Sequence, residues 1–344
     1  MKTRTIGNLL TTLALVAVAQ LASAQEIVLK VHHFLPTVAI EHRLFIVPWC
    51  DKIAKESNNR LKCEIYPSMQ LGGSPAQLID QVRDGVADIV WSIPTYQAGR
   101  FIKTEVFELP FMTKSAQAAS PALLEYYQKH SLDEFKGTKL ITIHTLAGSV
   151  LFLTNKRPRT MEDLKGLKVR VPNRLAVKTA TALGMVPVQM PVTAIAEALS
   201  KNVVDGDLST WEASNMMGMQ EITKVNVEVP KGFPRAANFV GGMFMNQAKY
   251  DSLPADLKKV IDQNSGIEMT KWSARLADDE ERIGRKVAED RKNTSIVISV
   301  DEYNRWKKAT DSIKDEWIKE VTAKGANGKA LYEEAVSLLN KYGG

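Results

Sequence analysis

From Ile27 onward, runs of strand character alternate with helical runs, and this alternation limits the possible folds more than any other feature. Strand patterns occupy residues 27–33, 61–66 and 87–91, with helical patterns at 40–57 and 74–84 between them. A helix that returns the chain to the starting edge of a sheet makes successive strands parallel. The opening therefore predicts a parallel sheet with helices on both faces. Pro48 lies inside the first helical run and predicts a kink or boundary there, because proline lacks the N–H of the helix ladder.

The same alternation returns further along the chain. Strand patterns cover 140–145, 150–154, 168–171 and 186–189, and helical patterns cover 161–164, 174–183 and 192–200. The two units are separated near Gly148, and 344 residues are enough for two hydrophobic cores. We expect two α/β domains with a cleft between them.

From Leu253 the pattern becomes a long amphipathic helix that runs to about Arg291 and is interrupted only by Gly266. Such a helix spans roughly 55 Å at about 1.5 Å per residue, which is longer than either domain alone. We expect it to brace both domains. A coiled coil is the alternative, although no sustained apolar heptad supports it. One more strand is expected at 296–300, and residues 302–341 are expected to be helical.

The first residues predict export. Lys2 and Arg4 precede a mostly apolar stretch, 6–21, and the small residues 22–24 form a cleavage signal before Gln25. We therefore expect a signal peptide at 1–24 and a periplasmic or secreted mature protein. No cysteine follows the cleavage position, which argues against a lipid anchor, and no later stretch approaches a membrane-spanning length.

Charge and cysteine content narrow the function further. Removal of Lys2 and Arg4 lowers the formal net charge from +6 to +4, an excess that suits small anions and is too weak for nucleic-acid binding. Cys50 and Cys63 are the only cysteines, and in an oxidising compartment we predict a disulfide between them. Closing so short a loop contributes roughly 3 kcal/mol. Two unpaired buried thiols are the alternative, because spacing alone does not place their Cβ atoms together.

Arg170 is the candidate anion-binding residue. Val169 and Val171 alternate with Lys168 and Arg170 as in a strand with one buried face, and Pro172 ends the ladder. A guanidinium at a strand end can hold a carboxylate through two parallel charge-assisted hydrogen bonds. A surface arginine or a structural ion pair is the alternative.

Catalytic and cofactor motifs are missing from the sequence. There is no nucleophile elbow, phosphate loop, dinucleotide glycine motif or zinc-protease helix motif, so we expect no cofactor and no enzyme activity. The nearest approach to a zinc site is His32, His33, Glu41 and His42. Their spacing matches no metal motif, and neighbouring residues on a strand point to opposite faces. A periplasmic metal-dependent enzyme that uses His33 and His42 remains the alternative from a different functional class.

Several short motifs in a fixed order point to a known family. The most specific is the segment 163–172, and the supporting segments are 70–73, 84–88, 107–111, 204–206 and 250–254. Over essentially the whole mature chain, the sequence resembles the solute-binding subunits of tripartite ATP-independent periplasmic (TRAP) transporters.

The resemblance implies a two-domain periplasmic-binding-protein fold that closes around an organic acid held by Arg170. Domain I would comprise 25–147 plus 236–275, and domain II would comprise 148–235 plus 276–344. The loaded protein, expected to be a monomer, would dock on the membrane permease subunits without using ATP. Delivery of the same ligand to a sensor kinase is an alternative fate.

Departures from the family pattern bear on the ligand. Many sialic acid and dicarboxylate binders of this family carry a second arginine on the strand occupied here by Val150 and Leu151, and this chain has no arginine between Phe101 and Arg157. The frequent asparagine after Asp-Gly corresponds roughly to Ser209. We therefore favour an aromatic or apolar monocarboxylate, such as a 2-oxo or 2-hydroxy acid, over a small C4-type or dicarboxylate ligand.

Aromatic and polar residues near the strand ends supply the remaining candidate contacts. We expect Trp91 and Trp211 to enclose the hydrophobic end of the ligand, with polar contacts from Tyr96, His33 and Ser209. A core role is the alternative for each aromatic candidate, including Trp91 and Trp211. The weaker candidates are Phe34, Phe152 and Phe233.

Overall fold

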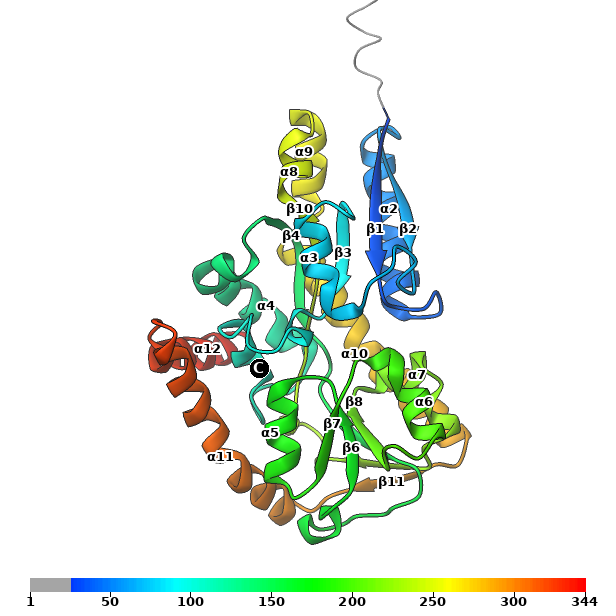
Figure 1. Ribbon diagram of the computed structural model, residues 1–344, viewed down its shortest axis with the longest axis vertical. Coiled ribbons are helices and arrows are strands. Elements are labelled where there is room, and N and C mark those ends of the chain that lie inside the picture. The colour runs from blue at the N-terminus through cyan, green and yellow to red at the C-terminus, as the bar shows by residue number, and fades with distance from the viewer. Residues whose placement is uncertain (1–25) are drawn as a thin grey trace, which may run out of the picture.

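Two mixed β-sheets organise residues 26–344, which are the residues that this computed structural model describes (Figure 1). The predicted signal peptide, 1–24, lies outside them. The strands are β1 (Ile27–His33), β2 (Leu61–Tyr66), β3 (Ile89–Ser92), β4 (Thr138–Thr145), β5 (Val150–Leu153), β6 (Lys168–Val171), β7 (Val186–Gln189), β8 (Gly206–Ser209), β9 (Val225–Glu228), β10 (Val240–Asn246) and β11 (Thr294–Val297).

The first sheet has the strand order β2-β1-β3-β10-β4. Strand β1 pairs in parallel with β2 and β3, which confirms the parallel opening predicted from the sequence. Strand β10 was not predicted, and it runs antiparallel between β3 and β4. At Gly242 a Cβ atom would lie 2.8 Å from the carbonyl oxygen of Thr142, so glycine is needed where the two strands meet.

The second sheet has the strand order β11-β9-β5-β8-β6-β7. Strand β6, which carries Arg170, lies between β8 and β7 and is parallel to both. Strand β5 is antiparallel to β8 and β9. Strands β8 and β9 were not predicted, and β11 begins at Thr294, before the predicted start at Ile296.

Helices cover the faces of both sheets (Figure 1). The α-helices are α2 (Val47–Glu56), α3 (Leu78–Arg83), α4 (Ala116–Tyr126), α5 (Arg174–Ala182), α6 (Ile195–Ser200), α7 (Trp211–Met216), α8 (Gln247–Ser252), α9 (Ala255–Gln263), α10 (Ile267–Asp290), α11 (Val300–Ala323) and α12 (Gly328–Tyr342). Shorter helical turns used below are the π-helix η1 (Glu41–Ile46) and the 3-10 turns η3 (Pro94–Tyr96) and η4 (Thr104–Glu108). Pro48 lies in the first turn of α2, at the predicted boundary.

The molecule has two halves, the first built around the first sheet and the second around the second sheet. Helix α10 connects them. It packs against α4 and η1 beside the first sheet and against α7 beside the second, as expected for a bracing helix (Figure 1). The predicted long helix is interrupted between α9 and α10, where Gly266 adopts a φ of +80°. Helix α11 packs against α5 of the second sheet, whereas α12, placed in domain II by the family resemblance, packs against α4 of the first.

A disulfide and a tryptophan hydrogen bond fix helix α2 to its neighbours. Cys50 of α2 and Cys63 of β2 form the predicted disulfide, with their Cα atoms 5.7 Å apart. The indole of Trp49 donates a hydrogen bond of 2.8 Å to the carbonyl oxygen of Asn264, which ties α2 to the break before α10.

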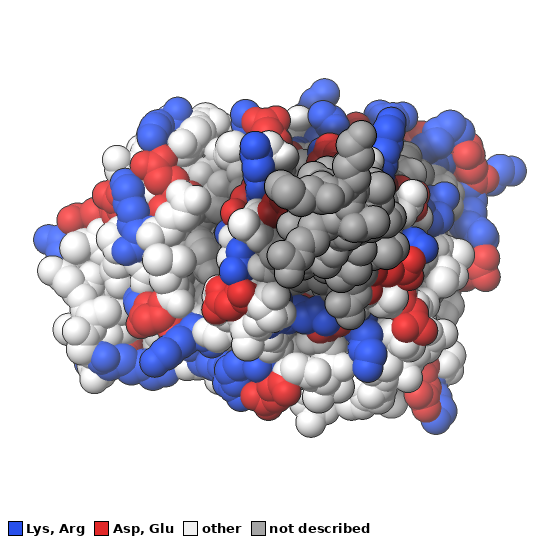
Figure 2. Space-filling view, turned by 90° about the horizontal axis from the view of Figure 1, so that it is seen from above, with Lys and Arg blue, Asp and Glu red and all other residues white. Residues whose placement is uncertain are grey.

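Among residues 26–344, no helix is long and apolar enough to cross a membrane. Basic and acidic side chains are interspersed over the face shown in Figure 2.

Candidate ligand-binding site

Arg170 is buried inside the second sheet rather than exposed at its edge. It pairs with Val188 on β7 and with Asp207 on β8, and its relative exposure is 1%. The sequence pattern predicted one buried face for β6, but Val169, Arg170 and Val171 are all buried. A buried guanidinium needs polar partners, because transfer of a charge out of water is costly.

Two groups of the protein hold the guanidinium of Arg170. Its Nε donates to the carbonyl oxygen of Met190 at 2.8 Å, and its Nη1 lies 3.2 Å from Oδ1 of Asp207. Its Nη2 is buried without a well-aligned hydrogen-bond acceptor among the described residues, and the hydroxyl of Tyr96 lies close to the guanidinium. Burial raises the pKa of Asp207 to about 6, although the charge of Arg170 opposes this shift. The arginine therefore has one edge fixed by the protein and one nitrogen available to a ligand.

A small cavity adjoins Arg170. Residues from both halves of the molecule line it. Its polar and charged lining residues are Tyr96, Arg170, Ser209, Thr210 and Glu212. Its apolar lining residues are Phe34, Leu35, Trp91, Ile93, Leu146, Pro172, Val192, Ala213, Met216 and Phe239.

Three aromatic residues from the first half form one wall of this cavity. Phe34 follows β1, Trp91 lies on β3 and Tyr96 ends η3. The ring of Phe34 lies 5.5 Å from that of Trp91 and 5.8 Å from that of Tyr96, measured between centroids. The hydroxyl oxygen of Tyr96 accepts a hydrogen bond of 3.4 Å from the N–H of Val192, which leaves its O–H available as a donor.

Trp211 does not line this cavity, and its role in enclosing the ligand with Trp91 stays a prediction. Its ring packs edge-on against Phe152 at 5.0 Å, and the guanidinium of Arg285 lies 5.7 Å from its centroid. Its indole N–H donates to Glu228 at 3.3 Å. These contacts occupy both the ring and the N–H, so Trp211 and Phe152 belong to the core of the second half.

His33 and Phe233 also lie outside the cavity lining, so their contacts with a ligand stay predictions. Nε2 of His33 lies 3.1 Å from Nδ1 of His42, and burial lowers the pKa of His33 to about 3. Phe233 packs edge-on against Tyr303, with their centroids 4.8 Å apart. In residues 26–344, no group of three or more histidine, cysteine or acidic side chains is placed to hold a metal ion.

The structure adds two acidic residues that the sequence analysis did not select. Asp207 holds Arg170, and Glu212 lines the cavity from the first turn of α7. Asp207 directly follows the segment 204–206 that carried part of the family resemblance, so its position offered a signal. Glu212 had no signal of its own, because a carboxylate next to a helix N-terminus is ordinary on a protein surface.

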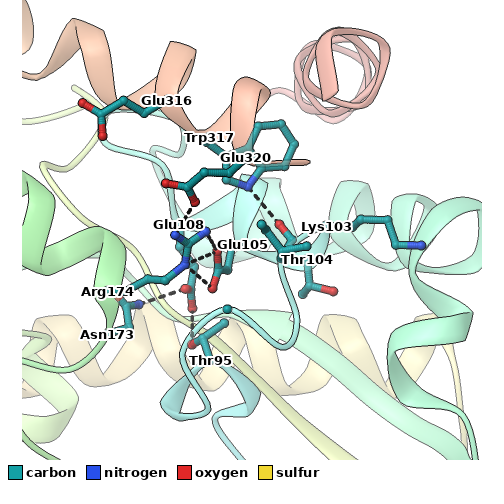
Figure 3. Close-up of polar contacts among 12 residues, drawn as sticks. Thr95, Lys103, Thr104, Glu105, Glu108, Asn173, Arg174, Glu316, Trp317 and Glu320 are labelled. Carbon is teal, nitrogen blue, oxygen red and sulfur yellow. Dashed lines mark hydrogen bonds and ion pairs between the residues drawn. The ribbon is translucent and has the colours of Figure 1, made fainter. Parts of the chain in front are cut away.

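A polar cluster joins the two halves beside the cavity. Figure 3 shows Glu105 and Glu108 of η4 facing Asn173 and Arg174 at the start of α5. Nε of Arg174 lies 2.7 Å and 2.9 Å from the two carboxylate oxygens of Glu105, and Arg174 also pairs with Glu320 of α11. The amide of Asn173 donates to Glu108 at 2.8 Å, and burial raises the pKa of Glu108 well above its usual value. These bonds hold α5, which directly follows the Arg170 strand, against the first half.

Comparison with known proteins places these features in a wider group. The sequence model of the bacterial extracellular solute-binding proteins, family 7, matches residues 32–320. A TRAP solute-binding protein from Rhodoferax ferrireducens, solved with copurified benzoate, is 39% identical with a TM-score of 0.90, and the alignment covers 92% of this chain and 98% of that one.

Two further solved structures are similar over the same part of the chain. A marine metagenome TRAP protein described as specific for aromatic acid ligands, solved with 3-hydroxybenzoate, is 40% identical with a TM-score of 0.90. That alignment covers 92% of this chain and 99% of that one. A TRAP protein from Bordetella bronchiseptica, solved with both enantiomers of mandelate, is 26% identical with a TM-score of 0.83, and the coverage is again 92% and 99%.

Proposed function

Because this chain belongs to the bacterial extracellular solute-binding proteins of family 7, we propose that it captures an aromatic monocarboxylate in the periplasm for uptake by a TRAP transporter. The observation that carries this proposal is the unpaired Nη2 of Arg170 beside a cavity walled by Phe34, Trp91 and Tyr96. The solved relatives that held benzoate, 3-hydroxybenzoate and mandelate support the same ligand class.

Arg170 and the aromatic wall have different tasks. Nη2 of Arg170 and the O–H of Tyr96 are donors for the ligand carboxylate, and a charge-assisted hydrogen bond contributes about 1.5–3 kcal/mol net. Micromolar binding requires about 8 kcal/mol, in addition to the cost of ordering the ligand. Burial of the ring against the aromatic wall supplies the remainder, at about 25 cal/mol per Å² of apolar surface.

The cavity favours a monocarboxylate over a dicarboxylate. Among the described residues that line it, Arg170 is the only lysine or arginine, and Asp207 already neutralises part of its charge. A second ligand carboxylate would therefore be buried without a cation, which is strongly unfavourable. Aromatic 2-oxo and 2-hydroxy acids remain within the proposed class, because their extra polar group lies next to the carboxylate.

Transport rather than catalysis is the proposed role. After export and removal of residues 1–24, the loaded receptor would deliver its ligand to the membrane permease subunits as a monomer. The polar contacts between η4 and α5 join the two halves, as closure around a bound ligand requires. Uptake of labelled ligand by cells with and without the permease subunits separates transport from delivery to a sensor kinase.

A thermal-shift screen of residues 25–344 against organic acids tests the ligand class. Benzoate, mandelate, benzoylformate and phenylpyruvate should raise the melting temperature more than succinate, malate or sialic acid do. Stabilisation by dicarboxylates or sialic acid, with the aromatic monocarboxylates silent, would exclude this proposal.

A further inference from the structure

Glu212 is a cavity-lining carboxyl group with unused hydrogen-bonding capacity. It lines the cavity from α7 with a relative exposure of 4%, and its fully buried Oε2 meets no N–H or O–H donor among the described residues. The hydroxyl groups of Ser209 and Thr210 belong to the same lining. Thr210 Oγ1 accepts from the N–H of Ala213 at 3.1 Å, which leaves its O–H available as a donor.

The carboxyl group of Glu212 faces another carboxyl group from the opposite half. Glu41 of η1 is 2% exposed, and both of its carboxylate oxygens are buried without an N–H or O–H donor from the described residues. The two carboxyl groups contact each other, and such a contact is a hydrogen bond only if they share a proton. Burial raises the pKa of both residues, and the charge of Glu280 on α10 adds to the effect.

A carboxyl pair that shares one proton has a definite chemical character. Its single O–H is consumed between Glu41 and Glu212, so the remaining oxygens act only as acceptors. A buried acceptor without a donor is unfavourable, and a ligand that brings an O–H or N–H to it gains affinity. The rest of the cavity lining is mostly apolar, and the indole N–H of Trp91 is a donor within it that is buried without an acceptor among the described residues.

We propose that Glu212 selects aromatic acids that carry a hydrogen-bond donor, such as a ring hydroxyl, remote from the carboxylate held by Arg170. This inference rests on the proposed function and narrows its ligand class. Glu41 acts as a positioning residue, because its carboxyl group contacts that of Glu212. Arg170 then binds the anionic end of the ligand and Glu212 binds the donor on its ring.

Calorimetric titration of the wild-type protein tests the selection without any mutation. The ligands are benzoate, the three hydroxybenzoate isomers, 3-aminobenzoate and 3-methoxybenzoate. At least one hydroxybenzoate should bind about five- to tenfold more tightly than benzoate, the gain expected from one satisfied buried acceptor. The methoxy compound, which has a similar shape and no donor, should lose this gain. The amino compound tells whether any N–H or O–H donor serves or only a hydroxyl does.

Two substitutions assign the effect to Glu212. Glu212→Gln keeps an acceptor for the ligand and supplies an N–H for Glu41, so the preference for the hydroxyl should persist. Glu212→Leu removes the acceptor, so hydroxybenzoate and benzoate should bind within about twofold of each other. The wild-type comparison with 3-methoxybenzoate still decides the matter if the leucine variant fails to fold.

The failure of this inference differs from failure of the proposed function. If benzoate binds and every hydroxybenzoate binds no more tightly than 3-methoxybenzoate, Glu212 does not select a donor. Full retention of the hydroxyl preference in Glu212→Leu has the same meaning. If no aromatic carboxylate binds at all, the proposed function is wrong and the selection falls with it.

Discussion

Arg170 and Asp207 form an ion pair inside the second sheet, with Nη1 3.2 Å from Oδ1 and side-chain exposures of 1% and 0%. The pair fixes the guanidinium but also neutralises it, so an incoming carboxylate meets a cation whose charge is already shared. The affinity of the site therefore depends on whether Asp207 is ionised.

Lowering the pH should strengthen ligand binding through Asp207. Its pKa is about 6, so the carboxylate is neutralised as the pH falls from 8 to 5.5, while a carboxylic acid ligand remains largely ionised. Asp207→Asn keeps an oxygen for Nη1 and removes the charge. The variant should bind benzoate about five- to tenfold more tightly at pH 8, with little dependence on pH. Calorimetry across this range checks both statements, and equal pH profiles for the two proteins would contradict them.

Protonation of Asp207 should also make the free energy of unfolding depend on pH. Asp207 has a pKa of about 6 in the folded protein and an ordinary value of 3.8, so the folded state binds more protons between these values. Its contribution to the free energy of unfolding is therefore present at low pH and is lost as the pH rises from about 4 to 6. Urea denaturation of wild-type protein and Asp207→Asn should show this difference in slope, and parallel profiles would rule it out.

Trp91 and Trp211, which are both buried, should respond differently to substitution. Trp91 lines the cavity, so Trp91→Leu should weaken binding of aromatic acids by about tenfold or more. Trp211 packs against Phe152 in the core, so Trp211→Leu should lower the free energy of unfolding by about 2–4 kcal/mol and change affinity less than about threefold. Calorimetry and urea denaturation on both variants make the test. Loss of affinity at unchanged stability in Trp211→Leu would return this residue to the site.

Breaking the ion pair between Arg174 and Glu105 should lower the stability mainly because the carboxylate of Glu105 stays buried without a cation. The side chain of Glu105 is 1% exposed, and Arg174 contacts both of its carboxylate oxygens (Figure 3). Arg174→Gln should therefore lower the free energy of unfolding by about 3–5 kcal/mol, because it leaves a buried carboxylate without its cation. The double variant with Glu105→Gln should recover much of that loss. Chemical denaturation measures the coupling, and purely additive effects would show that the pair acts independently.

The parts of the fold that could be predicted are those that depend only on the sequence of one local segment. The alternation from Ile27, the break at Gly266 and the boundary at Pro48 all follow from periodicity and backbone chemistry. Strand β10 escaped prediction because its Gly241-Gly242 pair weakens the strand signal. Its glycines are explained only by the neighbouring strands β3 and β4, which lie far earlier in the chain, at 89–92 and 138–145.

The residues of the candidate site, too, could be selected only in part from the sequence. Arg170, Trp91, Tyr96, Phe34 and Ser209 were selected from the sequence, and the structure brings them together around one cavity. Trp211 was selected on equal grounds, yet a six-residue helix does not reveal which face it turns to the core. Glu212 was missed because buried carboxyl groups are rare. Its contact with Glu41 of the opposite half cannot be read from the sequence around either residue.

The most direct test of the account is calorimetric titration of residues 25–344 with benzoate, on wild-type protein and on Arg170→Ala. Because Arg170 supplies the charge-assisted contact, the wild type should bind one benzoate per chain with a dissociation constant of about 1 μM or below. The alanine variant should bind at least about thirtyfold more weakly while remaining folded by circular dichroism. Unchanged affinity in Arg170→Ala, or no binding of benzoate by a wild-type protein that binds succinate tightly, would contradict the account.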